Sequence, residues 1–285
     1  MAVEHTPRCH VGTCSWSFDE WKGPFYPAHL PRREWLRWYA ARFTAVEADS
    51  TFYGVPGPAV LADWADAAPP DFRFCVKAPK AFTHAAAADR DPDVLGRFLR
   101  AVEALGDRLG CVLLQFPPWL RADAHFNEVA QCIADLPAGF RYAVEFRDRS
   151  WDGHRMDERL VARGVARVWD DVGPVGECGA CLHRPRTAPH VYLRLMGDLS
   201  TKYDTSGAFR HHYRKPIWDR GVEIEAWVQR LKTEHGLEEV FVLANNHYEG
   251  FAPSTARRVA AALGIRLPQP PPEAAPPIQG EFWSE

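Results

Sequence analysis

The sequence contains no long hydrophobic run and no apolar leader. No stretch approaches the roughly 18 apolar residues that a membrane-spanning helix needs. The first nine residues also lack the apolar core of a signal peptide. We therefore expect a cytoplasmic protein that makes no use of a membrane.

The seven cysteines are an odd number and have no framework spacing. Four of them lie inside apolar runs: Cys14, Cys75, Cys111 and Cys132. This placement is typical of small buried thiols in a reducing compartment, so we expect no disulfide framework. Cys178 and Cys181, followed by His183, form only half of a zinc ligand set and have no second pair at suitable spacing. We predict no zinc there.

Neither sign of charge is in large excess. The 34 Lys and Arg against 37 Asp and Glu leave a net charge of −3, which argues against a protein that binds nucleic acid or a membrane over its whole surface. A Gly-x-Gly-x-x-Gly turn is also missing after the first β-type run, which disfavours a doubly wound dinucleotide-binding sheet. The composition, with 46% hydrophobic and 25% charged residues, is that of an ordinary globular chain.

Short β-type runs alternate with helical patterns along almost the whole chain. The eight β-type runs cover residues 11–16, 45–50, 72–77, 111–116, 141–147, 165–170, 191–196 and 239–245. The helical patterns between them lie near 32–43, 58–67, 92–106, 123–135, 155–163, 223–235 and 253–263. This alternation in 285 residues predicts a single α/β protein, a (β/α)8 barrel of the TIM type, which needs about 250 residues.

Two segments depart from this alternation. Gly and Pro fill residues 172–190, so we expect the sixth helix to be reduced to a turn. From residue 267 onward proline dominates, which predicts an extended tail. We therefore divide the chain into a barrel at 1–266 and a proline-rich tail at 267–285. The tail is a candidate ligand for a partner domain, and a simple strap or disordered end is the favoured alternative.

Charged side chains recur at the carboxyl ends of the predicted strands. Side chains in a barrel strand alternate between the interior and the helix layer, so parity assigns each of them a side. The residues assigned to the interior are Glu47, Asp49, Lys77, Gln115, Glu145, Arg147 and Arg194, and the last strand ends in Asn245, Asn246 and His247. An ion-pair layer that merely fills the barrel is one interpretation. We prefer a binding or catalytic site, because burying so many charges is costly for a purely structural layer.

Aromatic and basic residues concentrate in the loops that follow these strand ends. Trp16, Tyr53 and Trp151 are candidates for stacking on a sugar or a nucleobase, and roofing the barrel is their alternative role. The long loop at 197–216 carries six basic residues: Lys202, Arg210, His211, His212, Arg214 and Lys215. The length and basic composition of this loop predict either a lid that binds an anion or a solvated charged segment.

Several of these segments together resemble the YecE-like family, which is catalogued as a domain of unknown function (number seventy-two). The matching motifs lie at 11–18, 21–27, 47–53, 72–79, 114–118, 143–147, 150–151, 192–197 and 245–247. With the helical pattern that follows, the resemblance runs from about residue 11 to residue 263, nearly the whole chain. It implies one TIM-type barrel and no settled activity. This chain has Asp49 and Met196 where the family pattern usually has Asn and His.

The strand-end residues favour an enzyme that acts on a small anionic substrate, such as a phosphorylated sugar or a nucleotide. Lys77, Arg147 and Arg194 would hold the anion and stabilise developing negative charge. Glu145 or Glu47 would be the general acid or base, and Arg147 beside Glu145 is expected to keep that carboxyl ionised. The predicted catalytic residues are thus Glu47, Lys77 and Glu145. A Schiff base at Lys77 is disfavoured, because acidic neighbours would keep the amine protonated.

Three other functions stay open. Two inward carboxyls also suit glycoside hydrolysis if their separation is right. A nucleic-acid protein, similar to the barrel endonucleases to which relatives have been likened, would use the aromatic loops and the basic lid. The third is a non-catalytic binding protein. We predict no cofactor and disfavour a multi-zinc nuclease, because His247 is the only histidine in a strand-end motif, but a single divalent cation on Glu47, Asp49 and Glu145 stays open.

Overall fold

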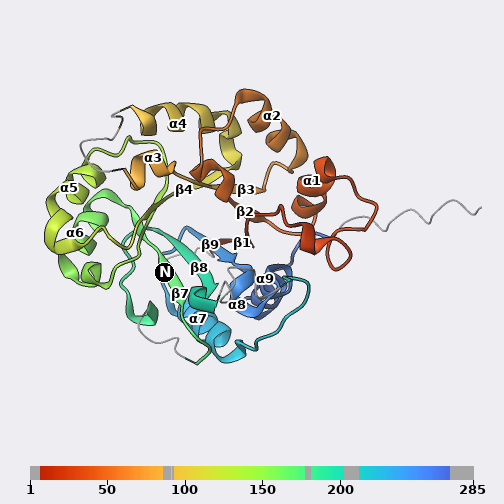
Figure 1. Ribbon diagram of the computed structural model, residues 1–285. Coiled ribbons are helices and arrows are strands. Elements are labelled where there is room, and N and C mark those ends of the chain that lie inside the picture. Colours follow the sequence, from red (N-terminus) through yellow and green to blue (C-terminus); the bar gives the residue numbers. More distant parts are fainter. Residues whose placement is uncertain (1–6, 86–90, 92, 177–180, 202–211, 270–285) are drawn as a thin grey trace, which may run out of the picture.

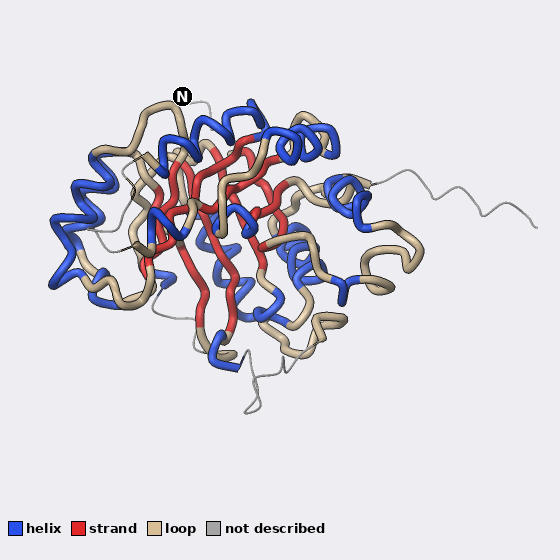
Figure 2. Tube along the Cα trace, turned by 45° about the horizontal axis from the view of Figure 1, so that its top comes forward, coloured by secondary structure: helices blue, strands red, loops and turns tan. Residues whose placement is uncertain are grey.

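A sheet of short parallel strands curls into a barrel at the centre of the molecule, with helices around its outside (Figures 1 and 2). The computed structural model describes residues 7–85, 91, 93–176, 181–201 and 212–269. The strands in these residues are β1 (Arg8–Cys14), β2 (Ala45–Ala48), β3 (Arg73–Lys77), β4 (Leu109–Phe116), β5 (Tyr142–Phe146), β6 (Ala166–Arg167), β7 (Trp169–Val172), β8 (His190–Gly197) and β9 (Glu239–Ala244). Their order in the sheet is β6-β5-β4-β3-β2-β1-β9-β8-β7. The predicted α/β barrel is confirmed.

The barrel closes through a strand that is broken at Val168. β6 pairs with β5, β7 pairs with β8, and only Val168 separates β6 from β7 in the chain. The Val168 N–H donates to the Val144 carbonyl oxygen at 2.9 Å, so the path of the strand continues through the break. The sixth predicted strand, 165–170, therefore becomes two short strands.

The helices lie where the periodicity predicts them. In the described residues they are α1 (Trp35–Ala40), α2 (Pro58–Ala67), α3 (Lys80–Thr83), α4 (Val94–Val102), α5 (Ala122–Ala134), α6 (His154–Arg163), α7 (Gly221–Thr233), α8 (Asn246–Glu249) and α9 (Ala252–Ala262). The seven predicted helices are all present, and the short helices α3 and α8 are additional. None of the helices in this part of the chain is long and apolar enough to cross a membrane.

The segment between β7 and β8 has no α-helix among its described residues. Its helical piece is a single 3-10 turn at Cys181–His183, in agreement with the expected loss of the sixth helix. Residues 177–180, and with them Cys178, lie outside the described residues, so the zinc prediction is not tested. Most of the predicted tail, residues 270–285, also lies outside them, and the division of the chain at residue 266 stays a prediction.

The strands separate two apolar cores. The larger core lies between the sheet and the helices and includes Val46, Val76 and Val144. The smaller core lies inside the barrel and contains many small side chains, among them Cys14, Ala45, Cys75, Cys111 and Ala143. The alternation confirms the parity assignment, and small interior side chains leave room for long charged ones. Three of the cysteines expected to be buried are indeed buried, whereas Cys132 on α5 is only partly buried.

Candidate functional site

Three charged side chains from different strands meet inside the barrel. Arg194 of β8 pairs with Glu47 of β2 (Nη2 to Oε1, 2.6 Å) and, through Nη1, with Glu145 of β5. The Tyr192 hydroxyl donates to the other Glu47 oxygen at 2.7 Å. Glu47, Glu145 and Arg194 are each at most 2% exposed. One guanidinium group thus bridges two buried carboxylates, and we call these three residues the buried triad.

Arg147 lies nearer to the solvent than the buried triad. It follows β5 directly, pairs through Nε with Glu145 and donates from Nη2 to Gln115 Oε1 at 3.2 Å. Its side chain is 18% exposed, so a solute can reach it. Both terminal nitrogens of Arg194, by contrast, are occupied by carboxylates. The geometry makes Arg194 the group that positions two acids, and not the anion contact that the sequence suggested.

Lys77, the last residue of β3, is buried without a direct ion pair. It is 8% exposed, and its Nζ lies 4.1 Å from the centroid of the Phe52 ring. Within the described residues no carboxylate lies at ion-pair distance from this amine. The Thr51 hydroxyl accepts a hydrogen bond from the Lys77 N–H at 2.9 Å. The backbone is therefore fixed at the point where the side chain enters the mouth of the barrel.

The pKa of the Lys77 amine is lower than that of a free lysine. Burial lowers the pKa most, and the positive charge of Arg194 lowers it further. Asp49, Glu47 and Glu145 raise it, but their effect is outweighed. The expectation that acidic neighbours would prevent such a shift is therefore wrong, because burial and the charge of Arg194 together outweigh the three acids.

The carboxyl groups of the mouth differ in their affinity for a proton. Burial alone would raise the pKa of Glu145, but Arg147 and Arg194 outweigh it and lower the pKa, as expected. Arg194 likewise lowers the pKa of Glu47 against the effect of burial. For Asp49, burial and the Glu47 charge raise the pKa to about 6. The site therefore combines carboxylates that stay ionised, Glu47 and Glu145, with a carboxyl that can carry a proton, Asp49. Acid–base chemistry near neutral pH requires such a combination.

Two residues of the mouth were not among the expected site residues. Tyr192 lies two positions before Arg194 on β8 and has the same parity, so strand periodicity could have found it. His84 lies in the loop after α3, edge-on to Phe52 with ring centroids 5.0 Å apart. Burial and the charge of Lys77 lower the pKa of His84. A loop position has no periodic signal, which is why the sequence did not place His84.

The Asn-Asn-His segment begins a helix and does not end a strand. β9 stops before Asn245, whose side chain accepts the His247 N–H at 3.0 Å and so caps α8. Asn246 Oδ1 accepts a hydrogen bond from Trp21 Nε1 at 3.2 Å. His247 Nε2 is 2.9 Å from the Tyr213 hydroxyl, in the loop after β8. Asn245 thus caps a helix and Asn246 binds Trp21, and a direct role of these three residues in binding a substrate stays a prediction.

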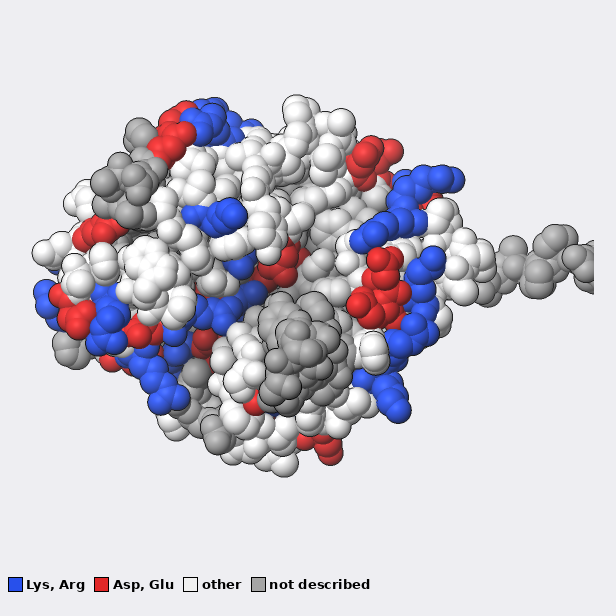
Figure 3. Space-filling model, in the orientation of Figure 1, with Lys and Arg blue, Asp and Glu red and all other residues white. Residues whose placement is uncertain are grey.

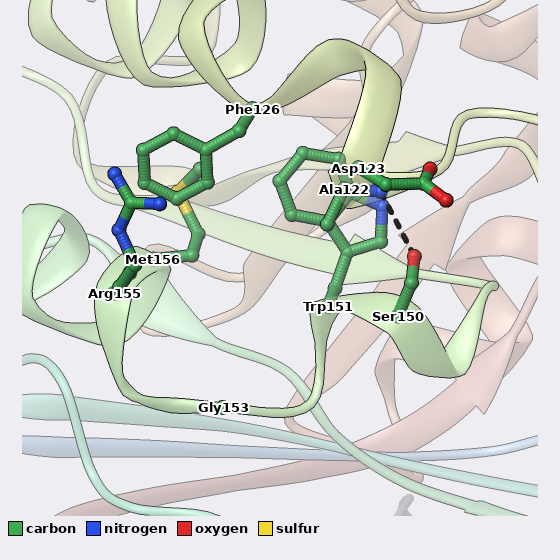
Figure 4. A pocket seen from close by; sticks show the side chains of 8 residues that line it. All are labelled: Ala122, Asp123, Phe126, Ser150, Trp151, Gly153, Arg155 and Met156. Atoms are coloured by element: carbon green, nitrogen blue, oxygen red, sulfur yellow. Dashed lines mark hydrogen bonds between the residues drawn. The ribbon is translucent and has the colours of Figure 1, made fainter.

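The three aromatic candidates lie in different surroundings. Tyr53 is 75% exposed, whereas Trp16 is partly buried and edge-on to Trp64. Trp151 is 2% exposed and stacks on Phe146 with ring centroids 4.4 Å apart. It also lines a pocket of about 290 Å³ beside α5 and α6 (Figure 4). Trp151 therefore packs between sheet and helices, and Tyr53 is the ring most open to a solute.

Within the described residues, two non-glycine residues have a left-handed backbone, and both border this region. Ser15, directly after β1, has a φ of 67°, and Tyr213 has a φ of 42°. The Ser15 N–H donates to the Glu47 carbonyl oxygen at 2.8 Å, which holds the strained turn against β2. Strained backbone that is fixed by its surroundings clusters at functional sites.

The face of the molecule shown in Figure 3 is hollowed near its centre, where acidic and basic side chains lie next to one another. The predicted lid is described only in part, because Lys202, Arg210 and His211 lie outside the described residues. The remaining basic residues of this loop, His212, Arg214 and Lys215, are exposed. Anion gripping by the lid therefore stays a prediction.

A metal site finds no support in the described part of the chain. No three His, Cys, Asp or Glu side chains there are grouped as metal ligands. Of the carboxylates considered for a divalent cation, Glu47 and Glu145 are both bound by Arg194. A cation shared with Asp49 would have to compete with that guanidinium group.

Fold and site together define a TIM-type barrel protein with a charged mouth. A family model described as a protein of unknown function, DUF72, matches residues 10–279. The chain therefore belongs to the DUF72 family, as its motifs implied.

The relatives of this chain agree with that assignment. It is 32% identical over 176 residues to the UPF0759 protein YecE of Escherichia coli K12, which covers 58% of this chain and about 60% of the length of YecE. It is 24% identical over 283 residues to the UPF0759 protein YunF of Bacillus subtilis, covering 90% of this chain and 95% of YunF.

Solved structures of the family have the same fold. A crystal structure of a DUF72 family protein from Thermotoga maritima superposes with a TM-score of 0.73 at 26% identity, and covers 90% of this chain and 99% of that one. A DUF72 family protein from Enterococcus faecalis gives a TM-score of 0.71 at 20% identity, with coverage of 92% and 98%. The second comparison shows the fold alone.

Proposed function

We propose that this protein is an enzyme that acts on a small anionic substrate at the mouth of the barrel. The observation that carries the proposal is a pair of cations at the mouth, Lys77 and Arg147, of which only Arg147 pairs with the buried triad, through its Nε and Glu145. Lys77 has no direct ion pair within the described residues, and Arg147 is reachable from solvent. Cations placed in this way at strand ends are expected in a binding site and are costly in a purely structural layer.

Each charged residue then has a defined role. Arg147 offers its Nη1, which has no hydrogen-bond partner among the described residues, to a carboxylate or phosphate oxygen. Glu145, held ionised, accepts a proton from the substrate. Asp49, with a pKa of about 6, donates one. Arg194 fixes the two buried carboxylates and serves as a positioning residue.

Thermal unfolding in the presence of anions tests this proposal. Phosphate, sulfate, sugar phosphates and mononucleotides are compared at fixed ionic strength with a chloride control. A ligand at a hundred times its dissociation constant stabilises by about 2.7 kcal/mol, which such a melt detects. We expect at least one anion to stabilise the wild type and Arg37→Met, a control at an exposed arginine on α1, but not Arg147→Met. Equal shifts in all three proteins, or no shift beyond chloride, would show that the mouth binds no anion.

A nucleic-acid function is the second candidate, and two exposed rings favour it. Tyr53 and Trp119 are 75% and 50% exposed, as rings that stack on unpaired bases would be. Binding of a single-stranded oligonucleotide should weaken steeply with salt, because counterions are released. Binding of a small anion beside the buried triad should depend on salt far less. Titrations at two salt concentrations therefore separate the two functions.

A further inference from the structure

Lysine is rare in this protein, and only one described lysine is buried. The 34 basic residues include six lysines. Four of the others are exposed and one is outside the described residues: Lys22, Lys80, Lys215 and Lys232, and Lys202. The other buried cationic side chains of the described residues, such as Arg194 and Arg220, are arginines. The buried primary amine of this part of the chain therefore lies at the mouth of the barrel.

The choice of lysine at this position has a chemical consequence. A guanidinium group would bind an anion at least as well, since it is forked and always charged. An amine differs because it can lose its proton and become a nucleophile. Burial and the lack of a carboxylate at ion-pair distance favour that neutral form, and they act against the cation–π contact of the amine with the Phe52 ring, which favours the charged one. Binding alone therefore does not account for Lys77.

We propose that Lys77 forms an imine with a small substrate that carries both a carbonyl group and an anionic group, an inference that rests on the proposed function of the mouth. The neutral amine attacks the carbonyl carbon, and a C–N bond forms while the carbonyl oxygen becomes a hydroxyl. The hydroxyl then takes up a proton and leaves as water, which gives the imine. Water later hydrolyses the imine and frees the lysine, so the cycle needs no oxidant or reductant.

The neighbouring side chains supply what these steps require. Arg147 holds the anionic group. The proton for the departing hydroxyl comes from Asp49, whose pKa of about 6 lets it carry one near neutral pH. A protonated imine withdraws electrons from the adjacent carbon, so an ionised Glu145 can remove a proton there. The reactions that fit are proton abstraction beside a carbonyl or cleavage of a carbon–carbon bond.

Reductive alkylation of the folded, full-length chain tests the proposal. Glyoxylate, a small aldehyde with a carboxylate, is added with cyanoborohydride at pH 7.5, and peptide mass mapping follows each lysine over time. Glycolaldehyde, of similar size but neutral, is the matched probe. Lys80, exposed and three residues from Lys77, is the internal standard. We expect glyoxylate to modify Lys77 several-fold faster than Lys80, because the lowered pKa leaves a larger fraction of the Lys77 amine unprotonated and reactive.

Two variants make the outcome specific. Arg147→Met should abolish the preference of Lys77 for glyoxylate over glycolaldehyde. Lys77→Arg should leave the labelling of Lys80 unchanged. Modification of Lys77 no faster than of Lys80 would overturn the imine, and the proposed anion site would still stand if the anion melts succeed. Rapid labelling of Lys77 by both aldehydes, without a preference for glyoxylate, would overturn the proposal that the substrate carries an anionic group.

Discussion

Arg194 and Arg147 pair with the same carboxylate, that of Glu145, at different depths. Arg194 neutralises two buried acids, so Arg194→Met should leave Glu47 and Glu145 poorly compensated and cost about 3–5 kcal/mol of stability. Arg147→Met leaves that bridge in place and should cost less than about 1 kcal/mol. Urea unfolding of both variants measures the difference. A melting temperature lowered by tens of degrees in Arg147→Met would instead make Arg147 a structural residue.

Asp49 should make the stability of the protein depend on pH. Its pKa is about 6 in the folded chain, against an ordinary value of 3.8. The folded state therefore keeps this proton after the unfolded chain has lost it, and the wild type loses stability as the pH rises from about 4 to 6. Asp49→Asn removes this loss and should stabilise the protein by about 1–3 kcal/mol at pH 7.5, with little effect near pH 4.

Denaturant unfolding of wild type and Asp49→Asn at pH 4, 5, 6 and 7.5 checks this expectation. The difference between the two proteins should grow through the interval and level off above it. A constant difference across the whole range would mean that Asp49 does not hold its proton more tightly in the folded state.

Strand parity predicts which charged side chains enter the barrel, and Glu47, Lys77 and Glu145 all lie there. Parity does not predict which basic side chain forms an ion pair with a given carboxylate. That depends on how deeply each side chain is buried and on how long it is. For this reason the sequence made Arg194 an anion ligand and misjudged the pKa of Lys77. The first error comes from the capture of two carboxylates by a single guanidinium group, and the second from burial, which lowers the pKa of Lys77 more than any nearby charge.

Among the elements, β1 and β2 lie close together at Gly12, which is paired with Ala45. A Cβ atom at Gly12 would lie 1.8 Å from the Ala45 carbonyl oxygen, which belongs to backbone and cannot move aside cheaply. Gly12→Ala should therefore cost more than about 3 kcal/mol or prevent folding. Gly54→Ala, where a Cβ meets nothing within 4 Å, is the control and should change stability by less than about 0.5 kcal/mol. Similar unfolding curves for the two variants would contradict this close packing.

The seven predicted helices could be placed because each follows an amphipathic period, which extends over two or more turns in all of them except α1. The break at Val168 and the short helix α8 could not, since each depends on one or two residues. Asn245 did carry a usable signal, because Asn is a favoured N-cap residue. Its position after an apolar strand made it look like a strand end.

For the whole molecule, length and alternation sufficed to predict the barrel, because strand–helix–strand units in one chain leave few arrangements. Function is harder to predict from such totals. The net charge of −3 is spread over the whole chain, while the mouth sets three acids against three bases. Whether these six charged residues form a structural layer or a binding site depends on which of the cations a solute can contact. The composition contains no information on this.

The ring of strands is completed by β1 against β9, with Arg8 beside Glu239 and Thr13 beside Ala244. During synthesis on the ribosome this closure has to wait until β9 has emerged. Until β8 has appeared, Glu47 and Glu145 have no Arg194 and must stay hydrated. β1 meanwhile presents an open edge to other chains. The nascent protein therefore completes its charged mouth and its closed barrel late in synthesis, when β8 and then β9 have emerged.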